Sequence, residues 1–153
     1  MTRLAAALAA LLPAAALAEG IEIALPHIVA PPAAATVAGG YMQVTNAGEA
    51  PDRLVDAAVD PLIAGMAQLH EMQLDGDVMR MSRVAGVELP PGATVAFERG
   101  GLHVMLMDLA APLEPGDSVP VILHFERAGE IEAAFAVVAR GEEPKPHGPH
   151  GHD

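Results

Sequence analysis

The chain has no cysteine and no tryptophan, and only eight lysines and arginines against 20 aspartates and glutamates in 153 residues. Without cysteine there is no disulfide, and thiolate sulfur is excluded as a metal ligand. The formal net charge of −12 argues against a nucleic-acid partner, because phosphate recognition needs clustered basic residues. Any soft-metal site must therefore use methionine sulfur and histidine nitrogen.

The first eighteen residues differ from the rest of the chain. Arg3 precedes an unbroken run of leucine and alanine, Leu4–Leu12, and Ala16–Ala18 is a small-residue cleavage signal. This layout predicts a signal peptide over residues 1–18 and export to the periplasm, since the apolar run is too short for a permanent membrane helix. The mature chain would begin at Glu19. Its 135 residues (153 less 18) suit one domain with its own core, and no later apolar run is long enough to span a membrane.

Short apolar runs separated by turn residues follow, and no convincing helical periodicity is found after residue 18. Asp75-Gly76-Asp77 is a strong hairpin signal between two such runs. Residues 25–40, rich in proline, alanine and glycine, predict a loop-like lead-in. The pattern predicts an all-β sandwich or barrel. The eight expected strands cover residues 41–45, 53–59, 66–74, 78–84, 94–97, 102–109, 119–125 and 131–138.

Histidines and methionines recur at two-residue spacing within three of these strands. They are His70 and Met72, Met79 and Met81, and His103, Met105 and Met107. Residues two apart share one face of a strand, so each group presents its side chains together. If the three strands are neighbours, one end or face of the sandwich collects imidazoles and thioethers.

Two interpretations of this pattern compete. Methionine is a common core filler, and a single strand histidine is usually a surface residue or a satisfied polar group. However, two histidines are each followed by methionine at the second position. Thioether sulfur is a soft, neutral donor that suits Cu(I), whereas zinc more usually takes cysteine, more histidine or a carboxylate. The coincidence favours a copper site.

The spacing of four residues resembles a known family. Ten residues separate His70 from Met81, twenty-one separate Met81 from His103, and one separates His103 from Met105. This His-x10-Met-x21-His-x-Met pattern is similar to that of the PCuAC periplasmic copper chaperones. The local text is also similar, with LHEM at 69–72, VMRM at 78–81, GGLHVMLMDL at 100–109 and YMQVTN at 41–46. The resemblance covers roughly residues 40–139.

The resemblance implies a cupredoxin-like β-sandwich, assigned here to residues 19–140, that binds Cu(I) through the same four residues. It implies a periplasmic copper chaperone that delivers the metal to a copper-enzyme assembly pathway, with cytochrome c oxidase as the expected destination. The partner would be an oxidase subunit or a thiol-containing assembly protein. The methionines outside the pattern, Met72, Met79 and Met107, are expected to form a hydrophobic shell around the site.

The C-terminal segment 141–153, GEEPKPHGPHGHD, predicts a disordered tail. It carries His147, His150 and His152 within six residues, beside acidic groups. Imidazoles and carboxylates on a flexible chain suit Cu(II), so the tail is a candidate second metal site.

Other classes fit the sequence less well. A blue-copper site needs cysteine, a histidine-brace oxygenase needs an N-terminal histidine where cleavage leaves Glu19, and no Gly-x-Ser-x-Gly motif is present. We therefore expect no enzymatic activity. Two alternatives to the chaperone stay open: a metal-free exported β-sandwich module for adhesion or assembly, and a periplasmic copper storage or resistance protein.

Overall fold

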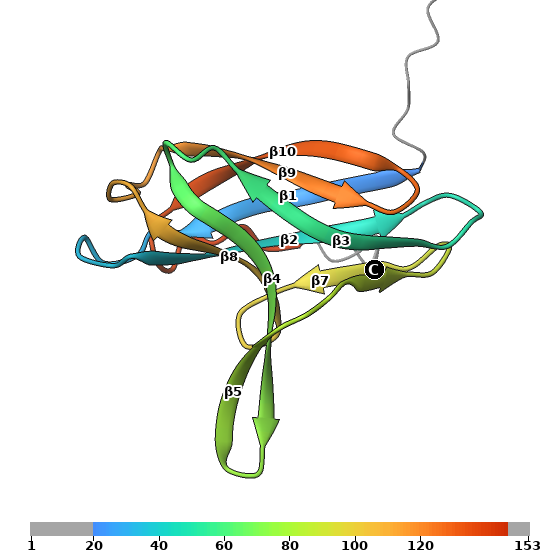
Figure 1. Cartoon of the computed structure of the whole chain (residues 1–153), viewed down its shortest axis with the longest axis horizontal. Helices are drawn as coiled ribbons and strands as arrows, with labels where there is room; N and C mark the ends of the chain where they lie inside the picture. The colour runs from blue at the N-terminus through green and yellow to red at the C-terminus, as the bar shows by residue number, and fades with distance from the viewer. Residues whose placement is uncertain (1–19, 147–153) are drawn as a thin grey trace, which may run out of the picture.

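A computed structural model describes residues 20–146, and these form ten β-strands without a helix (Figure 1). No helix in this part of the chain could cross a membrane. The expected all-β fold is therefore confirmed. The strands are β1 (Ile21–Val29), β2 (Val37–Asn46), β3 (Asp52–Val59), β4 (Ala64–Asp75), β5 (Val78–Arg83), β6 (Val87–Leu89), β7 (Thr94–Phe97), β8 (Leu102–Leu109), β9 (Ser118–Phe125) and β10 (Gly129–Val138).

The strands form one continuous sheet that folds over on itself as a sandwich. Its order is β5-β4-β8-β2-β1-β10-β9-β3-β6, and β7 pairs with β2 beside β8. All pairs are antiparallel except β1 with β10. β3 and β4 lie at distant places in this order but contact one another across a short turn. The two halves of the sheet therefore face each other over a shared core.

The core consists of aliphatic side chains, Met42 and the three phenylalanines. Leu69, Val104 and Leu106 are buried from the β4–β8 half, while Leu123 and Phe135 are buried from the β9–β10 half. Along each strand these residues alternate with side chains on the outer face, as period-two geometry requires. Burial of the core thus decides which residues of β4 and β8 are turned outward.

The predicted loop-like lead-in over residues 25–40 is wrong in most of its length. β1 runs through Val29 and β2 begins at Val37, so only residues 30–36 lack strand structure. Pro26 is accommodated at an irregularity between Ala24 and His27, where Leu25 has a positive φ of 54°. The lead-in is ordered because β1 joins β2 to β10, a long-range pairing that local composition does not reveal.

The observed strands differ from the predicted ones in two further ways. The first half of β2 contains Gly39 and Gly40, which weaken a strand signal. A Cβ on Gly40 would lie 3.2 Å from the ring of Phe135, so the absent side chain permits close packing. The short strand β6 was not expected. It pairs with β3 at the edge of the sheet, and together with β1 it makes ten strands where eight were predicted.

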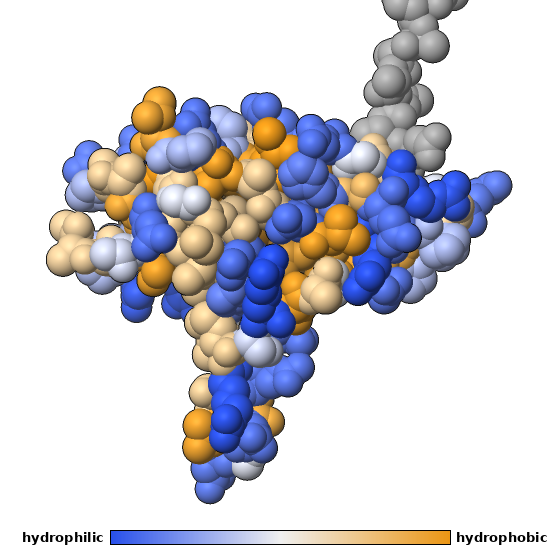
Figure 2. Space-filling model, viewed as in Figure 1, coloured by the Kyte–Doolittle hydropathy of each residue, from blue (hydrophilic) through white to orange (hydrophobic). Residues whose placement is uncertain are grey.

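The β4–β5 hairpin projects from the sandwich as an arm (Figure 1). Every residue of β5 is exposed, and the arm carries apolar side chains between charged ones (Figure 2). Leu74, Val78, Met79 and Met81 are among its exposed large hydrophobic residues. The arm therefore presents thioether sulfur to solvent, whereas most methionines of soluble domains pack inside.

The predicted tail begins with ordered residues. The sequence predicts disorder from residue 141, yet the backbone N–H of Glu142 donates to the carbonyl of Ala139, and Arg99 pairs with Glu143 at 3.4 Å. Residues 141–146 thus lie against the domain. The signal-peptide prediction for residues 1–18 and the three tail histidines fall outside the described residues.

Asn46 ties the end of β2 to two neighbouring segments, which generates a stability prediction. Its buried amide donates to the carbonyls of Ala50 and Leu89, and its side-chain oxygen accepts from the N–H of Gly48. Asn46→Ala leaves buried polar groups unpaired and should lower the free energy of unfolding by about 1–3 kcal/mol. Urea denaturation measures this. Thr45→Ala, which removes only an exposed hydroxyl pair with Thr94, is the control. An equal loss in both variants would contradict the prediction.

Candidate metal centre

The pairing of β4 with β8 and β5 places the predicted ligand residues on one face of the sheet. His70 lies directly opposite His103, and Met72 lies directly opposite Met81. Directly opposite residues in antiparallel strands share a face. Met105 lies two residues beyond His103 and therefore has the same orientation. The structure thus brings all four predicted ligands, together with Met72, to the outer face behind the core.

A cleft of about 420 Å³ opens on this face, and we call it the metal cleft. Three of the four predicted ligands line it, namely Met81, His103 and Met105, and Met72 lines it as well. His70 is adjacent, with its ring centroid 5.9 Å from that of His103. The other walls are the segment 29–32, the first half of β2, Arg99, Gly100 and Arg140.

Burial is graded across the centre. His103 is only 4% exposed, His70, Met72 and Met105 are half-buried, and Met81 on the arm is 47% exposed. The imidazole of His103 is therefore fixed inside the domain, while the thioether of Met81 is accessible from solvent. A metal held between them would have one rigid side and one accessible side.

Hydrogen bonds orient both imidazoles. His103 Nδ1 is 3.0 Å from the carbonyl oxygen of Gly101, and His70 Nε2 is 3.0 Å from Oε1 of Gln68. Because those partners are acceptors, the bonded nitrogens carry the protons and donate. The other nitrogens, His103 Nε2 and His70 Nδ1, are buried and have no partner among the described residues. In this tautomer each presents a free lone pair, which is what a metal requires of imidazole.

The β7–β8 turn sets the position of His103. The N–H of Gly101 donates to the carbonyl of Glu98, and Gly100 adopts a positive φ of 85° that favours glycine. The carbonyl of Gly101 accepts both from the ring of His103 and from the backbone N–H of Met72. This one carbonyl group therefore links the imidazole of His103 on β8 to the backbone of Met72 on β4.

The remaining predicted residues are placed less centrally. Met107 lies opposite Met66 at the far end of β8, and Met79 lies opposite Leu74 near the tip of the arm. Neither lines the metal cleft, whereas Met72 does. Of the three methionines expected to form a shell, Met72 therefore lines the cleft, and Met79 and Met107 do not.

Sequence reasoning missed several contributors. Tyr41 stands beside His103, with ring centroids 6.4 Å apart, and fits because a Cβ at Gly39 would lie 2.8 Å from its hydroxyl. Gln68 orients His70, and only its two-residue spacing from that histidine could have indicated it. Among the described residues, histidines, cysteines and acidic groups form no cluster of three that could hold a metal. The centre is detectable only when methionine is counted as a ligand.

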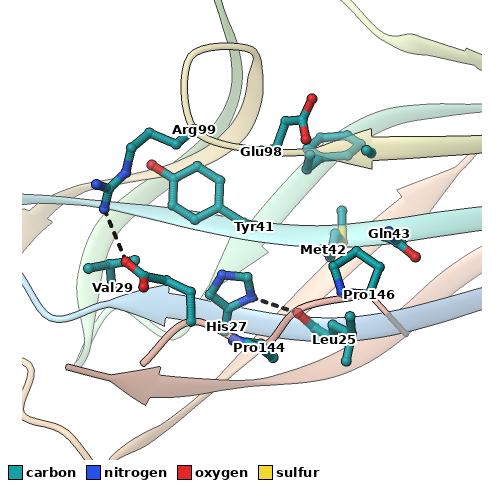
Figure 3. Close-up of a pocket in the computed structure, with 13 residues that line it drawn as sticks. Leu25, His27, Val29, Tyr41, Met42, Gln43, Glu98, Arg99, Pro144 and Pro146 are labelled. Carbon is teal, nitrogen blue, oxygen red and sulfur yellow. Dashed lines mark hydrogen bonds and ion pairs between the residues drawn. The ribbon is translucent and has the colours of Figure 1, made fainter. Parts of the chain in front are cut away.

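A second cleft of about 370 Å³ adjoins the metal cleft, and we call it the tail cleft. Tyr41 and Arg99 line both clefts, and residues Glu143, Pro144 and Pro146 form one wall of the second (Figure 3). His27 lies inside it, with a ring nitrogen bonded to the carbonyl of Leu25. The chain leading to the tail histidines therefore passes beside the metal centre.

The surroundings of His70 generate a prediction about its protonation. Burial lowers the pKa of His70 from the usual value of 6.5, and the nearby His103 and Arg83 lower it further. NMR titration of the metal-free protein should give a midpoint below 6.5. Because the native pKa is lowered, this histidine contributes stability that is present above pH 6.5 and is lost as the pH falls through the native pKa. Arg83→Gln should raise the midpoint, whereas Arg127→Gln should not. A midpoint at or above 6.5 would refute the assigned environment.

Comparison with known proteins identifies the family to which the chain is similar. The family described as "Putative lipoprotein LpqE-like" matches residues 21–137. "Putative lipoprotein Lxx21020" of Leifsonia xyli subsp. xyli (strain CTCB07) is 32% identical over 121 residues, which are 78% of this chain and 70% of that protein.

Solved structures extend the comparison. The copper-bound PCuAC domain from PmoF2 is 32% identical, with a TM-score of 0.66 over 78% of this chain and 93% of that one. The apo PCuAC domain from PmoF1 is 29% identical, with a TM-score of 0.66 over 78% and 94%. The solution structure of CuI-DR1885 from Deinococcus radiodurans is 28% identical, with a TM-score of 0.60 over 76% of each chain. The predicted PCuAC resemblance and cupredoxin-like fold are thus confirmed, and the chain belongs to the LpqE-like family.

Proposed function

We propose that this protein is an exported copper carrier that holds Cu(I) with His70, Met81, His103 and Met105. The observation that carries the proposal is the pair of buried imidazole nitrogens that have no partner among residues 20–146, beside a cleft lined by thioethers. Buried polar atoms are nearly always paired, so two unpaired lone pairs at one place point to an absent ligand. Two similar proteins solved with copper, the PmoF2 domain and CuI-DR1885, support copper as the metal.

The chemistry of the donors favours Cu(I) over divalent ions. Two thioethers and two neutral imidazoles add no negative charge to the complex, and within the described part of the chain no carboxylate lines the metal cleft. Zinc and Cu(II), with twice the charge, are less well compensated in such a site and prefer harder ligands. The Arg83 guanidinium opposite His70 adds a positive charge that opposes a divalent ion more strongly.

The graded burial suits a carrier. A transfer partner can approach Met81 on the exposed arm and replace its sulfur while the imidazoles still hold the metal. We therefore propose transfer by stepwise ligand exchange, with Met81 as the first ligand to leave. The recipient would belong to a copper-enzyme assembly pathway outside the cytoplasm, with cytochrome c oxidase as the destination that the PCuAC resemblance suggests. No catalytic step is needed.

The ligand set is tested by substitution within one arm. Met81→Leu keeps the volume of the side chain but removes its sulfur, so Cu(I) affinity should fall about tenfold or more. Met79→Leu is the matched control, because Met79 lies on the same strand and face but outside the metal cleft. Anaerobic competition with a Cu(I)-specific chelator gives the affinities.

X-ray absorption of the same two variants then identifies the ligand atoms. Sulfur scattering should weaken in Met81→Leu and stay unchanged in Met79→Leu. Equal weakening of binding in both variants, or tight binding that persists in His103→Ala, would rule out the proposed centre.

We further propose that His147, His150 and His152 form a second, weaker site for Cu(II). Their support from the described residues is positional: Pro146, the last described residue, lines the tail cleft beside the metal centre. Replacing the three histidines by alanine should remove one equivalent of bound Cu(II) and leave Cu(I) affinity unchanged. Equilibrium dialysis measures both. If Cu(II) stoichiometry does not change, the tail is not a metal site.

A further inference from the structure

The metal cleft has an unusual charge for this protein. The chain carries 20 acidic and eight basic residues, yet Arg99 and Arg140 line the cleft, and no aspartate or glutamate between residues 20 and 146 does. A third arginine, Arg83, lies opposite His70 at the edge of the centre. The fold therefore places three guanidinium groups around a site proposed to receive a cation, and one of them, Arg99, is paired with Glu143.

This arrangement does not favour capture of a bare metal ion. Guanidinium groups repel an approaching cation and attract anions, and an arginine fork is well matched to carboxylate oxygens. A chain so rich in acidic residues could have lined this cleft with carboxylates. The position of the arginines therefore indicates that what enters the cleft carries negative charge.

The size of the cleft indicates that the entering species is larger than a bare ion. Its volume of about 420 Å³ is within the range of small-molecule sites, which is roughly 300–1,000 Å³. A single ion that is held by protein side chains needs only a small part of that space. Room remains beside the thioethers for the ligand with which copper travels.

We propose that the metal cleft receives Cu(I) as a small anionic complex whose carboxylate is held by Arg99 and Arg140. The inference rests on the proposed function and specifies the chemical form in which Cu(I) reaches the protein. During transfer, bonds from copper to the incoming ligand break as bonds to thioether sulfur and imidazole nitrogen form. Copper stays Cu(I) throughout, and the released ligand leaves with its negative charge, so no oxidant or reductant is required.

Glu143 acts as an internal competitor for one of these arginines. Its carboxylate lies 3.4 Å from the Arg99 guanidinium, a long contact with both side chains partly exposed to solvent (Figure 3). Such a pair is weak and exchangeable. An incoming carboxylate can displace Glu143 from Arg99, so removal of the Glu143 charge should favour the incoming ligand.

The test uses two copper donors that differ by one charge. Cu(I) complexes of N-acetylcysteine and of N-acetylcysteine amide have the same thiolate, but only the first has a carboxylate. Stopped-flow transfer to the metal-free protein should be faster from the carboxylate donor. The double variant R99Q/R140Q should slow that transfer by roughly tenfold and leave the amide donor within about twofold. E143Q should accelerate the carboxylate donor, and R127Q, remote from the cleft, is the matched control.

A second measurement needs no copper. Citrate added to the metal-free protein should shift the methyl resonances of Met72 and Met105 saturably, and the shifts should disappear in R99Q/R140Q but not in R127Q. Equal rates from both donors in every variant, together with no citrate response, would overturn the inference. If Cu(I) from its acetonitrile complex still binds, the proposed function survives that result. If no donor loads the protein, the proposed function fails, and the citrate titration alone decides the anion site.

Discussion

The register of β4 against β8 is the constraint on which the proposed metal centre depends. It sets His70 opposite His103, and it is fixed by the inward side chains Leu69, Val104 and Leu106, which are almost fully buried. A slip of one residue would turn these aliphatic groups to solvent and the imidazoles into the core, at a cost of several kcal/mol. The hydrophobic core therefore holds the four proposed ligand residues on one face of the sheet.

Much of the proposed centre could be predicted, because the alternation of side chains between the two faces of a strand depends only on local sequence. The spacing of His103 and Met105, and of His70 and Met72, assigns each pair to one face of a strand without any knowledge of the fold. Long-range pairings were not predictable in the same way. The segment around Pro26 has the composition of a loop, and it becomes a strand because it pairs with β2 and with β10, which lies about a hundred residues later.

The polar details of the site depend on the tertiary structure. The carbonyl of Gly101 orients His103, and the side chain of Gln68 orients His70; neither interaction is visible until the turn and the register exist. The same holds for charge. Arg99 and Arg140 are widely separated in a strongly acidic sequence, and net charge alone would suggest a surface that attracts cations. Only the fold shows that they line one cleft.

The proposed ligand set compensates the charge of Cu(I) only weakly, and this affects how the metal is transferred. Neutral thioethers and imidazoles hold Cu(I) by donor softness alone, and the surrounding arginines oppose its charge. An acceptor with thiolate ligands neutralises the metal and binds it more tightly, so movement from this site to such an acceptor is favourable. The buried His103 limits spontaneous loss, while the exposed Met81 gives the acceptor a point of attack. The domain can therefore both retain and release the metal, because β8 supplies the buried ligand and β5 supplies the exposed one.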